Sequence, residues 1–413
     1  MNKLDLVKMM DIADVTSAKR IFARDYVTSG IPFYRGKEIT ELHRGALNVS
    51  TDLFITAEKF SEIKKKHGAP EEGDILLTSV GTLGSVYLVK PGDKFYFKDG
   101  NVTWFRNLAG VMGAYLRYWL ISPEGRAQLQ KCMIGSSQSA YTIENLKRME
   151  IRLPPLETQR RIASILGAYD DLIEVNRRRI AVLEEMARGL FEDWFVRFRF
   201  PGHETVPILD TPDGPLPEGW HYAALNEIAE VAFGFAFKSK AFSATPEGAR
   251  VVRIRDVPSG TTQTWTTELF DPRYAVINGD ILIGMDGIFH MALWVGGDAA
   301  LNQRVTRLRP INGYSKGWVF LSVYPHIKFF EATISGTTVA HLGAKHLNTI
   351  RVPVADPVTQ AKADRFFTPI DEELVNLRVA NQRLAASRDL LLPRLISGQL
   401  SVAQAERQLE EAA

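Results

Sequence analysis

The sequence contains a single cysteine, Cys132, among its 413 residues. One thiol cannot form an internal disulfide, and it excludes zinc sites that are built from several cysteines. The chain also lacks an apolar run long enough to span a bilayer. Its first residues, MNKLDLVKMMDIADV, carry Asp5 and Asp11 and have no apolar signal core. These absences favour a cytoplasmic protein in a reducing setting, with no membrane partner.

Net charge is nearly absent too, at +2 from 50 basic and 48 acidic residues. Bulk attraction is therefore excluded as the main source of any nucleic-acid binding, although local basic patches can still supply it. Apolar residues make up 45% of the chain and charged residues 24%, which is ordinary for a globular protein. The length favours two or three domains.

Motifs of common catalytic sites are missing as well. The sequence has no GxxxxGKS/T phosphate loop, no GxGxxG after a predicted strand, no HExxH, no GxSxG and no Asn-Pro-Pro-aromatic tetrad. His341 and His346 lie in a predicted loop without an evident third ligand, and we interpret them as structural. We interpret Asp170 and Asp171 as part of a solvated helix face. A scattered catalytic site stays open, but these absences favour a protein with no catalytic and no metal site.

Four sequence blocks of the first half return in the same order in the second half. They are DIADVTSA (11–18) with EIAEVAFG (227–234), GIPFYRGKEI (30–39) with GARVVRIRDV (248–257), EGDILLTSVGTLG (72–84) with NGDILIGMDGIFH (278–290), and GSSQSAYTIENLKRMEIRLPPLETQ (135–159) with GTTVAHLGAKHLNTIRVPVADPVTQ (336–360). The last pair lies 201 residues apart, which is too long for a solenoid repeat. We therefore predict an α/β (mixed α+β) fold of two duplicated globules with a pseudo-twofold relation.

Each repeat ends in a predicted long helix with a coiled-coil seam. Apolar residues recur in steps of four and three from Ile162 to Trp194, and the seam includes one polar residue, Asn176. The same seam 201 residues on is again largely apolar and contains Asn381. We predict that the two helices pair antiparallel and that the two asparagines fix their register. The alternative is a surface helix on which either asparagine faces solvent.

Proline and glycine mark the predicted boundaries. Thr368, Pro369 and Asp371 are typical of a helix start, so we expect the second long helix to be kinked or in two pieces. The segment 201–216 is dense in proline and glycine and predicts a linker. The predicted parts are a first globule at 1–153, a helical spacer at 154–200, the linker, a second globule at 217–352 and a C-terminal helical spacer at 353–413.

Basic and polar side chains in predicted loops are the candidates for DNA binding. Arg, Asn and Gln can read base edges with paired hydrogen bonds, while Lys mostly contacts phosphate. For any single residue the alternative is a solvated surface charge. The candidates are Lys19, Arg20, Arg35, Lys37, Ser136, Ser137, Gln138, Lys238, Arg253, Arg255, Asn302, Gln303, Arg304, Thr337 and Thr338.

Three motifs together resemble the specificity (S) subunit of type I restriction-modification systems. LPPLETQRRIASIL (153–166) closes the first globule, LPEGW (216–220) opens the second, and LLLPRLISGQL (390–400) lies in the second long helix. The resemblance covers essentially the whole chain. Two features depart from the family pattern: VPVADPVTQ (352–360) stands where a sequence nearer LPPLETQ is usual, and the N-terminus has no LPEGW of its own.

The resemblance implies two target recognition domains, each reading one half of a split double-stranded DNA target, with the helices as a spacer. It implies no catalytic activity and no bound cofactor on this chain, because S-adenosylmethionine, ATP and Mg belong to partner subunits. The implied partners are two adenine methyltransferase (M) subunits, docked on the helices, and restriction/translocase (R) subunits. The alternatives are a protein-binding scaffold with duplicated domains, and a fused enzyme with an unrecognised site.

Overall fold

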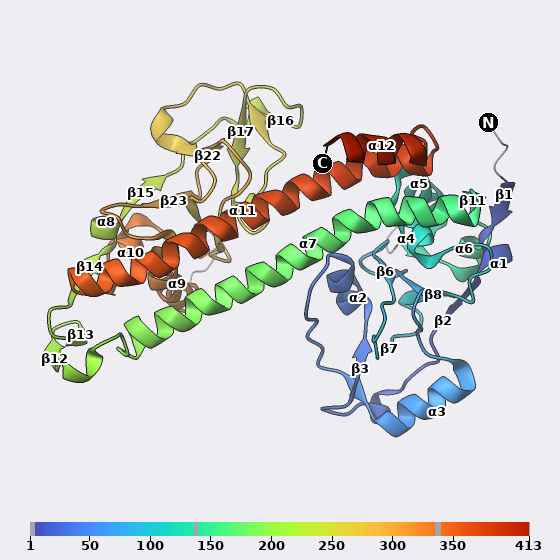
Figure 1. Cartoon of the computed structure of the whole chain (residues 1–413), viewed down its shortest axis with the longest axis horizontal. Helices are drawn as coiled ribbons and strands as arrows, with labels where there is room; N and C mark the ends of the chain where they lie inside the picture. Colours follow the sequence, from blue (N-terminus) through green and yellow to red (C-terminus); the bar gives the residue numbers. More distant parts are fainter. Residues whose placement is uncertain (1–4, 136–138, 335–339, 413) are drawn as a thin grey trace. The chain divides into compact units, whose positions relative to one another are not determined.

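The computed structural model describes residues 5–135, 139–334 and 340–412 (Figure 1). It forms two compact units: unit 1 comprises Met1–Val175 and Arg383–Ala413, and unit 2 comprises Asn176–Gln382. Both units mix strands and helices, as predicted. Within the described ranges, no helix combines the length and the apolar character needed to cross a membrane.

Unit 1 is built on a four-stranded antiparallel sheet in the order β2-β8-β5-β6. All four residues of β5 are buried, because the run ILLT is covered on both faces. In a second sheet, β4-β3-β7, strands β3 and β7 are parallel. The strands of unit 1 are β1 (Asp5–Lys8), β2 (Asp14–Ser17), β3 (Ile31–Tyr34), β4 (Phe54–Ile55), β5 (Ile75–Thr78), β6 (Val86–Leu88), β7 (Tyr96–Phe97), β8 (Val102–Arg106), β9 (Met133–Ile134), β10 (Ala140–Tyr141) and β11 (Glu150–Leu153).

The core of unit 1 lies between its larger sheet and its helices. Tyr115, Leu116 and Trp119 of α4 are fully buried and pack in one cluster with β5 and β8. The same cluster includes residues of α7, the end of α11 (Pro357–Ile396) and α12 (Val402–Ala412). The helices are α1 (Met9–Ile12), α2 (Gly36–His43), α3 (Ala57–His67), α4 (Gly113–Ile121), α5 (Pro123–Lys131), α6 (Ile143–Lys147), the start of α7 (Leu156–Phe191) and a 3-10 turn (Ala23–Asp25).

Unit 2 repeats this plan. Its sheet β15-β23-β20-β21 matches β2-β8-β5-β6, the pair β14–β24 matches β1–β11, and β17 and β22 are parallel like β3 and β7. The predicted duplication is thus confirmed in the topology. The strands are β12 (Ile208–Thr211), β13 (Gly214–Pro217), β14 (His221–Ala224), β15 (Ala229–Phe233), β16 (Phe242–Ser243), β17 (Ala249–Val252), β18 (Trp265–Thr266), β19 (Ala275–Val276), β20 (Ile281–Gly284), β21 (Met291–Leu293), β22 (Ala299–Leu301), β23 (Val305–Pro310) and β24 (Arg351–Val354).

The helices of unit 2 enclose a second core in which Trp318, Val319 and Phe367 are fully buried. They are α8 (Leu225–Ile228), α9 (Lys316–Thr333), α10 (Ala344–Leu347) and most of α11 (Pro357–Ile396), while α12 (Val402–Ala412) belongs to unit 1. Short turns of helix complete the unit at Glu192–Val196, His203–Thr205, Ser239–Ala241, Ile254–Asp256 and Pro272–Tyr274.

The compact units differ from the predicted division of the chain. Helices α7 and α11 each contribute one part to each compact unit, whereas the prediction lists them as parts of their own. The segment 201–216, expected as a linker, begins with turns and then forms most of the antiparallel hairpin β12–β13. Its prolines and glycines therefore shape a tight hairpin rather than an open connection.

The two long helices pair antiparallel within each unit. In unit 2, Asn176 Nδ2 donates to Asn381 Oδ1 at 2.9 Å, and Glu184 pairs with Arg378. In unit 1, Asp170 of α7 pairs with Arg388 of α11. As the residue number increases along α7, the number of the residue that it contacts on α11 decreases. The two helices therefore run antiparallel, as predicted.

Helix α11 runs unbroken from Pro357 to Ile396, so of the two expected outcomes at Pro369, a kink or two pieces, the second was wrong. An interior proline costs about 3 kcal/mol of helix stability. Phe367, Leu374 and Leu377 on the same helix are buried, and each buried side chain of this kind contributes about 1.5–3 kcal/mol. Packing on both sides of the proline therefore outweighs its local cost.

A buried carboxylate near Pro369 gives a pH-dependent prediction. Asp371 is 4% exposed and accepts the Gly317 N–H at 2.7 Å, at the start of α9. Burial raises the pKa of Asp371 to about 6, above the ~3.9 of an unfolded chain. Its contribution to stability is therefore complete below pH ~4 and is lost as the pH rises through about 6.

We expect Asp371→Asn to be more stable than the wild type above pH ~6, by up to about 3 kcal/mol, and to lose this advantage near pH ~4. The amide oxygen can still accept the Gly317 N–H but carries no charge to bury. Urea unfolding at several pH values measures the difference, with the exposed Glu372→Gln on the same helix as the control. A pH-independent difference would contradict the burial of a charged carboxylate.

Candidate nucleic-acid interface

An open basic depression of about 650 Å³ lies on unit 1. The start of α2 contributes Arg35 and Lys37, the residue after α2 is Arg44, and Thr82 and Asn101 come from the turns after β5 and before β8. Strand β10 lies beside this depression, because its residue Ala140 forms a β-bridge with Val80, which lines the depression. Loops that are far apart in sequence thus meet at one end of the two sheets.

Arg35 is held in place by acidic neighbours rather than left free. Its Nη2 lies 2.7 Å from Glu38 and 2.6 Å from Asp52. Burial works to raise the pKa of the Glu38 carboxyl, but the hydrogen bonds from Arg35 hold it below its ordinary value. Arg35 therefore fixes the start of α2, whereas Lys37 is 68% exposed and lies 3.8 Å from Glu41.

A second basic depression of about 430 Å³ on unit 1 brings together Lys19, Lys65, Lys66 and Arg106. The run of lysines ends α3, where positive charge is favoured by the helix dipole. Arg20 lies next in sequence to Lys19, is 64% exposed and contacts Asp99 at 3.0 Å. The predicted group of Lys19, Arg20, Arg35 and Lys37 is therefore divided between the two depressions and their surroundings.

The same loop arrangement recurs in unit 2, as the backbone hydrogen bonds show. The Ser79 N–H donates to Asn101 O at 2.8 Å in unit 1, and the Met285 N–H donates to Arg304 O at 2.9 Å in unit 2. The bridge of Val80 with Ala140 has its counterpart between Asp286 and His341. Asn101 and Arg304 consequently occupy equivalent positions.

The other candidates of unit 2 lie in loops and turns. Arg253 directly follows β17, stacks on Phe242 and begins a short 3-10 turn, while Arg255 in that turn is 65% exposed. Gln303 is exposed next to Arg304, and Lys238 is exposed in the turn after Phe237.

Asn302 is buried, and its Oδ1 has no hydrogen-bond partner within the described ranges. A Cβ added at Gly234 would lie only 1.9 Å from the Asn302 carbonyl oxygen. A glycine is thus required for the close approach of these two loops, and Asn302 forms part of the support beneath Gln303 and Arg304.

Arg304 belongs to a polar cluster that the sequence patterns did not reveal. Its Nε lies 3.5 Å from Asp286 Oδ2 and its Nη1 lies 3.2 Å from His341 Nδ1, while His341 Nδ1 lies 2.7 Å from Asp286 Oδ1. His346 has a different role, since its Nδ1 accepts the Gly343 N–H at 3.0 Å. Among the described residues, no group of three or more His, Cys, Asp or Glu side chains is arranged to hold a metal ion.

Five candidates, Ser136, Ser137, Gln138, Thr337 and Thr338, lie outside the described residues. Sequence reasoning also missed Arg44, Asn101 and Asp286. A possible signal was the repeat itself, because EGDILLTSVGTLG and NGDILIGMDGIFH place Val80 and Asp286 at corresponding positions.

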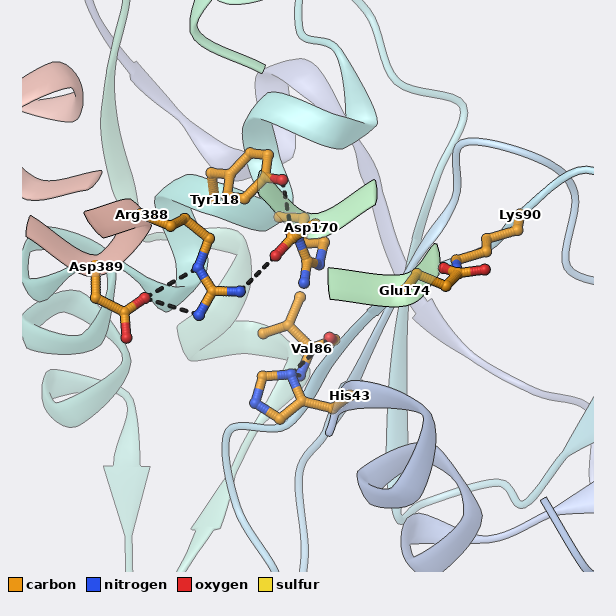
Figure 2. Close-up of polar contacts among 9 residues, drawn as sticks. His43, Val86, Lys90, Tyr118, Asp170, Glu174, Arg388 and Asp389 are labelled. Atoms are coloured by element: carbon orange, nitrogen blue, oxygen red, sulfur yellow. Dashed lines mark hydrogen bonds and ion pairs between the residues drawn. The ribbon is translucent and has the colours of Figure 1, made fainter. Parts of the chain in front are cut away.

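Asp170 anchors α7 to the rest of unit 1, as Figure 2 shows. Its carboxylate accepts hydrogen bonds from Tyr118 Oη at 2.7 Å and Arg117 Nη1 at 2.8 Å, and it also pairs with Arg388. Burial works to raise the pKa of Asp170, but the charge of Arg117 and the bonds from Tyr118 and Arg388 hold it below its ordinary value. The interpretation of Asp170 as part of a solvated face was therefore wrong, while Asp171 is exposed.

Two further contacts surround this network. Lys90 pairs with Glu174 one turn further along α7, and His43 at the end of α2 hydrogen-bonds the Val86 backbone at 2.9 Å (Figure 2). Burial lowers the pKa of His43, which favours the neutral imidazole. Asp170 and Glu174 thus tie helix α7 to α4 and to the segment after β6.

Comparison with known proteins gives a family match over both repeats. The model described as type I restriction modification DNA specificity domain matches residues 1–185 and 217–382. The type I restriction enzyme EcoBI specificity subunit of Escherichia coli is 29% identical over 191 residues, which are 45% of this chain and 40% of that protein. The chain thus spans less than half the length of this relative.

Other similarities extend over nearly the whole chain. The type I restriction enzyme MjaIX specificity subunit of Methanocaldococcus jannaschii is 25% identical over 423 aligned positions, covering 96% of this chain and 94% of that protein. The crystal structure of a type I restriction-modification system S subunit from M. genitalium shares the fold, with a TM-score of 0.55 and 17% identity over 96% of this chain and 97% of that one.

Proposed function

This chain belongs to the family of type I restriction modification DNA specificity domains, and we propose on that premise that it is the sequence-specificity subunit of such a system. Each unit reads one half of a bipartite DNA target. The observation that carries this proposal is the duplication of one loop arrangement, with Asn101 and Arg304 at equivalent positions in the two units. Duplicated readers suit a target that is itself in two parts.

The paired helices act as the spacer between the half-sites in this proposal. The Asn176–Asn381 hydrogen bond supports a fixed register, because a polar pair in an apolar seam is satisfied in only one alignment. Exposed apolar side chains on the same helices offer surface for partner subunits, among them Leu172, Val182, Met186 and Leu390. We infer that two methyltransferase subunits dock there and that restriction/translocase subunits join the larger complex.

The chemistry of the complex belongs to the partners in this proposal. The chain itself binds no cofactor and is not an enzyme; S-adenosylmethionine serves the methyltransferase subunits, and ATP and Mg serve the restriction/translocase subunits. We place the protein in the cytoplasm with them. Because the net charge is only +2, the chain alone should bind DNA weakly, and the partners add phosphate contacts.

A footprint on DNA with and without the methyltransferase tests this function against the scaffold alternative. We expect weak, salt-sensitive binding by the chain alone and clear protection of a bipartite site by the complex. If the complex forms but protects no specific DNA, the protein is a scaffold. Methyl transfer or cleavage by the purified chain alone would show instead that it is an enzyme.

A further inference from the structure

The backbone of Arg304 is fixed in an uncommon conformation. Its φ is 71°, in the left-handed region that few residues other than glycine adopt. The neighbouring Gln303 N–H donates to Phe235 O at 2.8 Å, and the Arg304 carbonyl accepts the Met285 N–H at 2.9 Å. Non-glycine residues persist in this region where their surroundings hold them, and they cluster at ligand-binding sites.

The guanidinium of Arg304 is oriented without being covered. Asp286 and His341 contact its Nε and Nη1, as described above, yet the side chain is 54% exposed. Its Nη2 group has no hydrogen-bond partner among the residues that the structure describes. Both the backbone and the guanidinium of Arg304 are therefore held in place, and the guanidinium still presents N–H donors to solvent.

We propose that Arg304 reads a guanine in the half-site of unit 2, with Asp286 and His341 as positioning residues. This inference rests on the proposed function. Guanine presents O6 and N7 side by side in the major groove, and the planar fork of arginine matches this pair of acceptors.

The carboxylate decides between a base contact and a phosphate contact. Asp286 lies beside the guanidinium and would repel a negatively charged phosphate, whereas the edge of guanine is neutral. An arginine that bound only a DNA phosphate would gain no affinity from the Asp286 carboxylate. The acidic partner therefore favours base reading over phosphate binding.

Unit 1 has a different residue at the equivalent position. The carbonyl of Asn101 accepts the Ser79 N–H as that of Arg304 accepts the Met285 N–H, but Asn101 offers an amide and Val80 replaces Asp286. An asparagine amide does not match the guanine edge in this way. A guanine contact from this loop position is therefore proposed for unit 2 and not for unit 1.

Sequencing of methylated adenines in DNA from cells that express each variant with the methyltransferase partner tests the proposal. In Arg304→Ala, we expect one invariant guanine of the wild-type target to accept other bases, with discrimination falling about 5- to 150-fold. The other half-site and the gap stay unchanged. Lys238→Ala, which removes an exposed lysine of the same unit, is the control and should weaken methylation of all sites equally.

Two further variants separate reading from general damage. Asp286→Ala should relax the same base position as Arg304→Ala, but less, because the arginine remains and only its orientation is lost. Arg304→Lys keeps the positive charge without the planar fork and should also relax that position.

An unchanged motif in Arg304→Ala, full discrimination in Arg304→Lys, or a change in the other half-site would overturn the inference. Absence of a bipartite motif with the wild-type chain would overturn the proposed function itself.

Discussion

Inserting four residues into both long helices should lengthen the gap between the half-sites by one or two base pairs and leave both half-sequences unchanged. The insertions follow Arg177 in α7 and Val379 in α11, close to the Asn176–Asn381 hydrogen bond. Four helical residues add about 6 Å, or nearly two base-pair steps of ~3.4 Å. They also turn the helix about 40° beyond a full turn, close to the rotation of one base pair.

The matching insertion in both helices keeps the antiparallel seam paired on either side. Sequencing of methylated adenines reports the gap and both half-sequences in one measurement. A four-residue insertion after Asp213, in the exposed turn of the β12–β13 hairpin, is the control and should leave the gap as it is. If the helix insertions leave the gap unchanged, or if the hairpin insertion alters it equally, the helices are not the spacer.

Removing the Asp170 carboxylate should cost about 2–4 kcal/mol of the free energy of unfolding, less than the full cost of breaking a deeply buried pair. Asp170→Ala leaves Arg117 and Arg388 without their shared partner, while both are about four-fifths covered. Urea unfolding measures the loss. The control is Asp389→Ala, because Asp389 contacts the same Arg388 but is 61% exposed; its removal should cost less than about 1 kcal/mol.

The effect of Asp170 should also depend on pH. Its pKa in the folded protein is depressed, so its contribution is present above the unfolded value of ~3.9 and is lost as the pH falls through the lower folded value. The wild type and Asp170→Ala should therefore differ fully at neutral pH and converge in acid. A small loss at neutral pH, equal to that of Asp389→Ala, would show that Asp170 is only a surface charge.

The duplication and the helical seam could be predicted because both are patterns along the chain. The recurring blocks indicate a repeated fold. The steps of four and three residues indicate a seam, because a helix places such residues on one face. The position of Pro369 illustrates the limit of local signals. Its helix-start pattern is genuine, but burial of Phe367 and Leu374 keeps α11 continuous.

For the candidate site, the sequence indicates the types of side chain but only part of their arrangement. Arginines in loops pointed to DNA binding, but the sequence did not show that Arg35 is held by Glu38 and Asp52. Partners distant in sequence are invisible to periodicity, and Asp170 and Arg388 are such a pair. Only the folded loops bring Asp286 next to Arg304.

The proposed function is that each unit reads one half-site and that the paired helices set the gap. Sequencing of the adenines that the wild-type complex methylates tests it most directly. We expect one motif of two short sequences whose centres lie about one DNA turn, ~34 Å, apart. Replacing residues 9–150 with the corresponding region of a relative should change one of these sequences and spare the other. A continuous motif without a gap, or a change in both halves after that replacement, would contradict the function proposed for this chain.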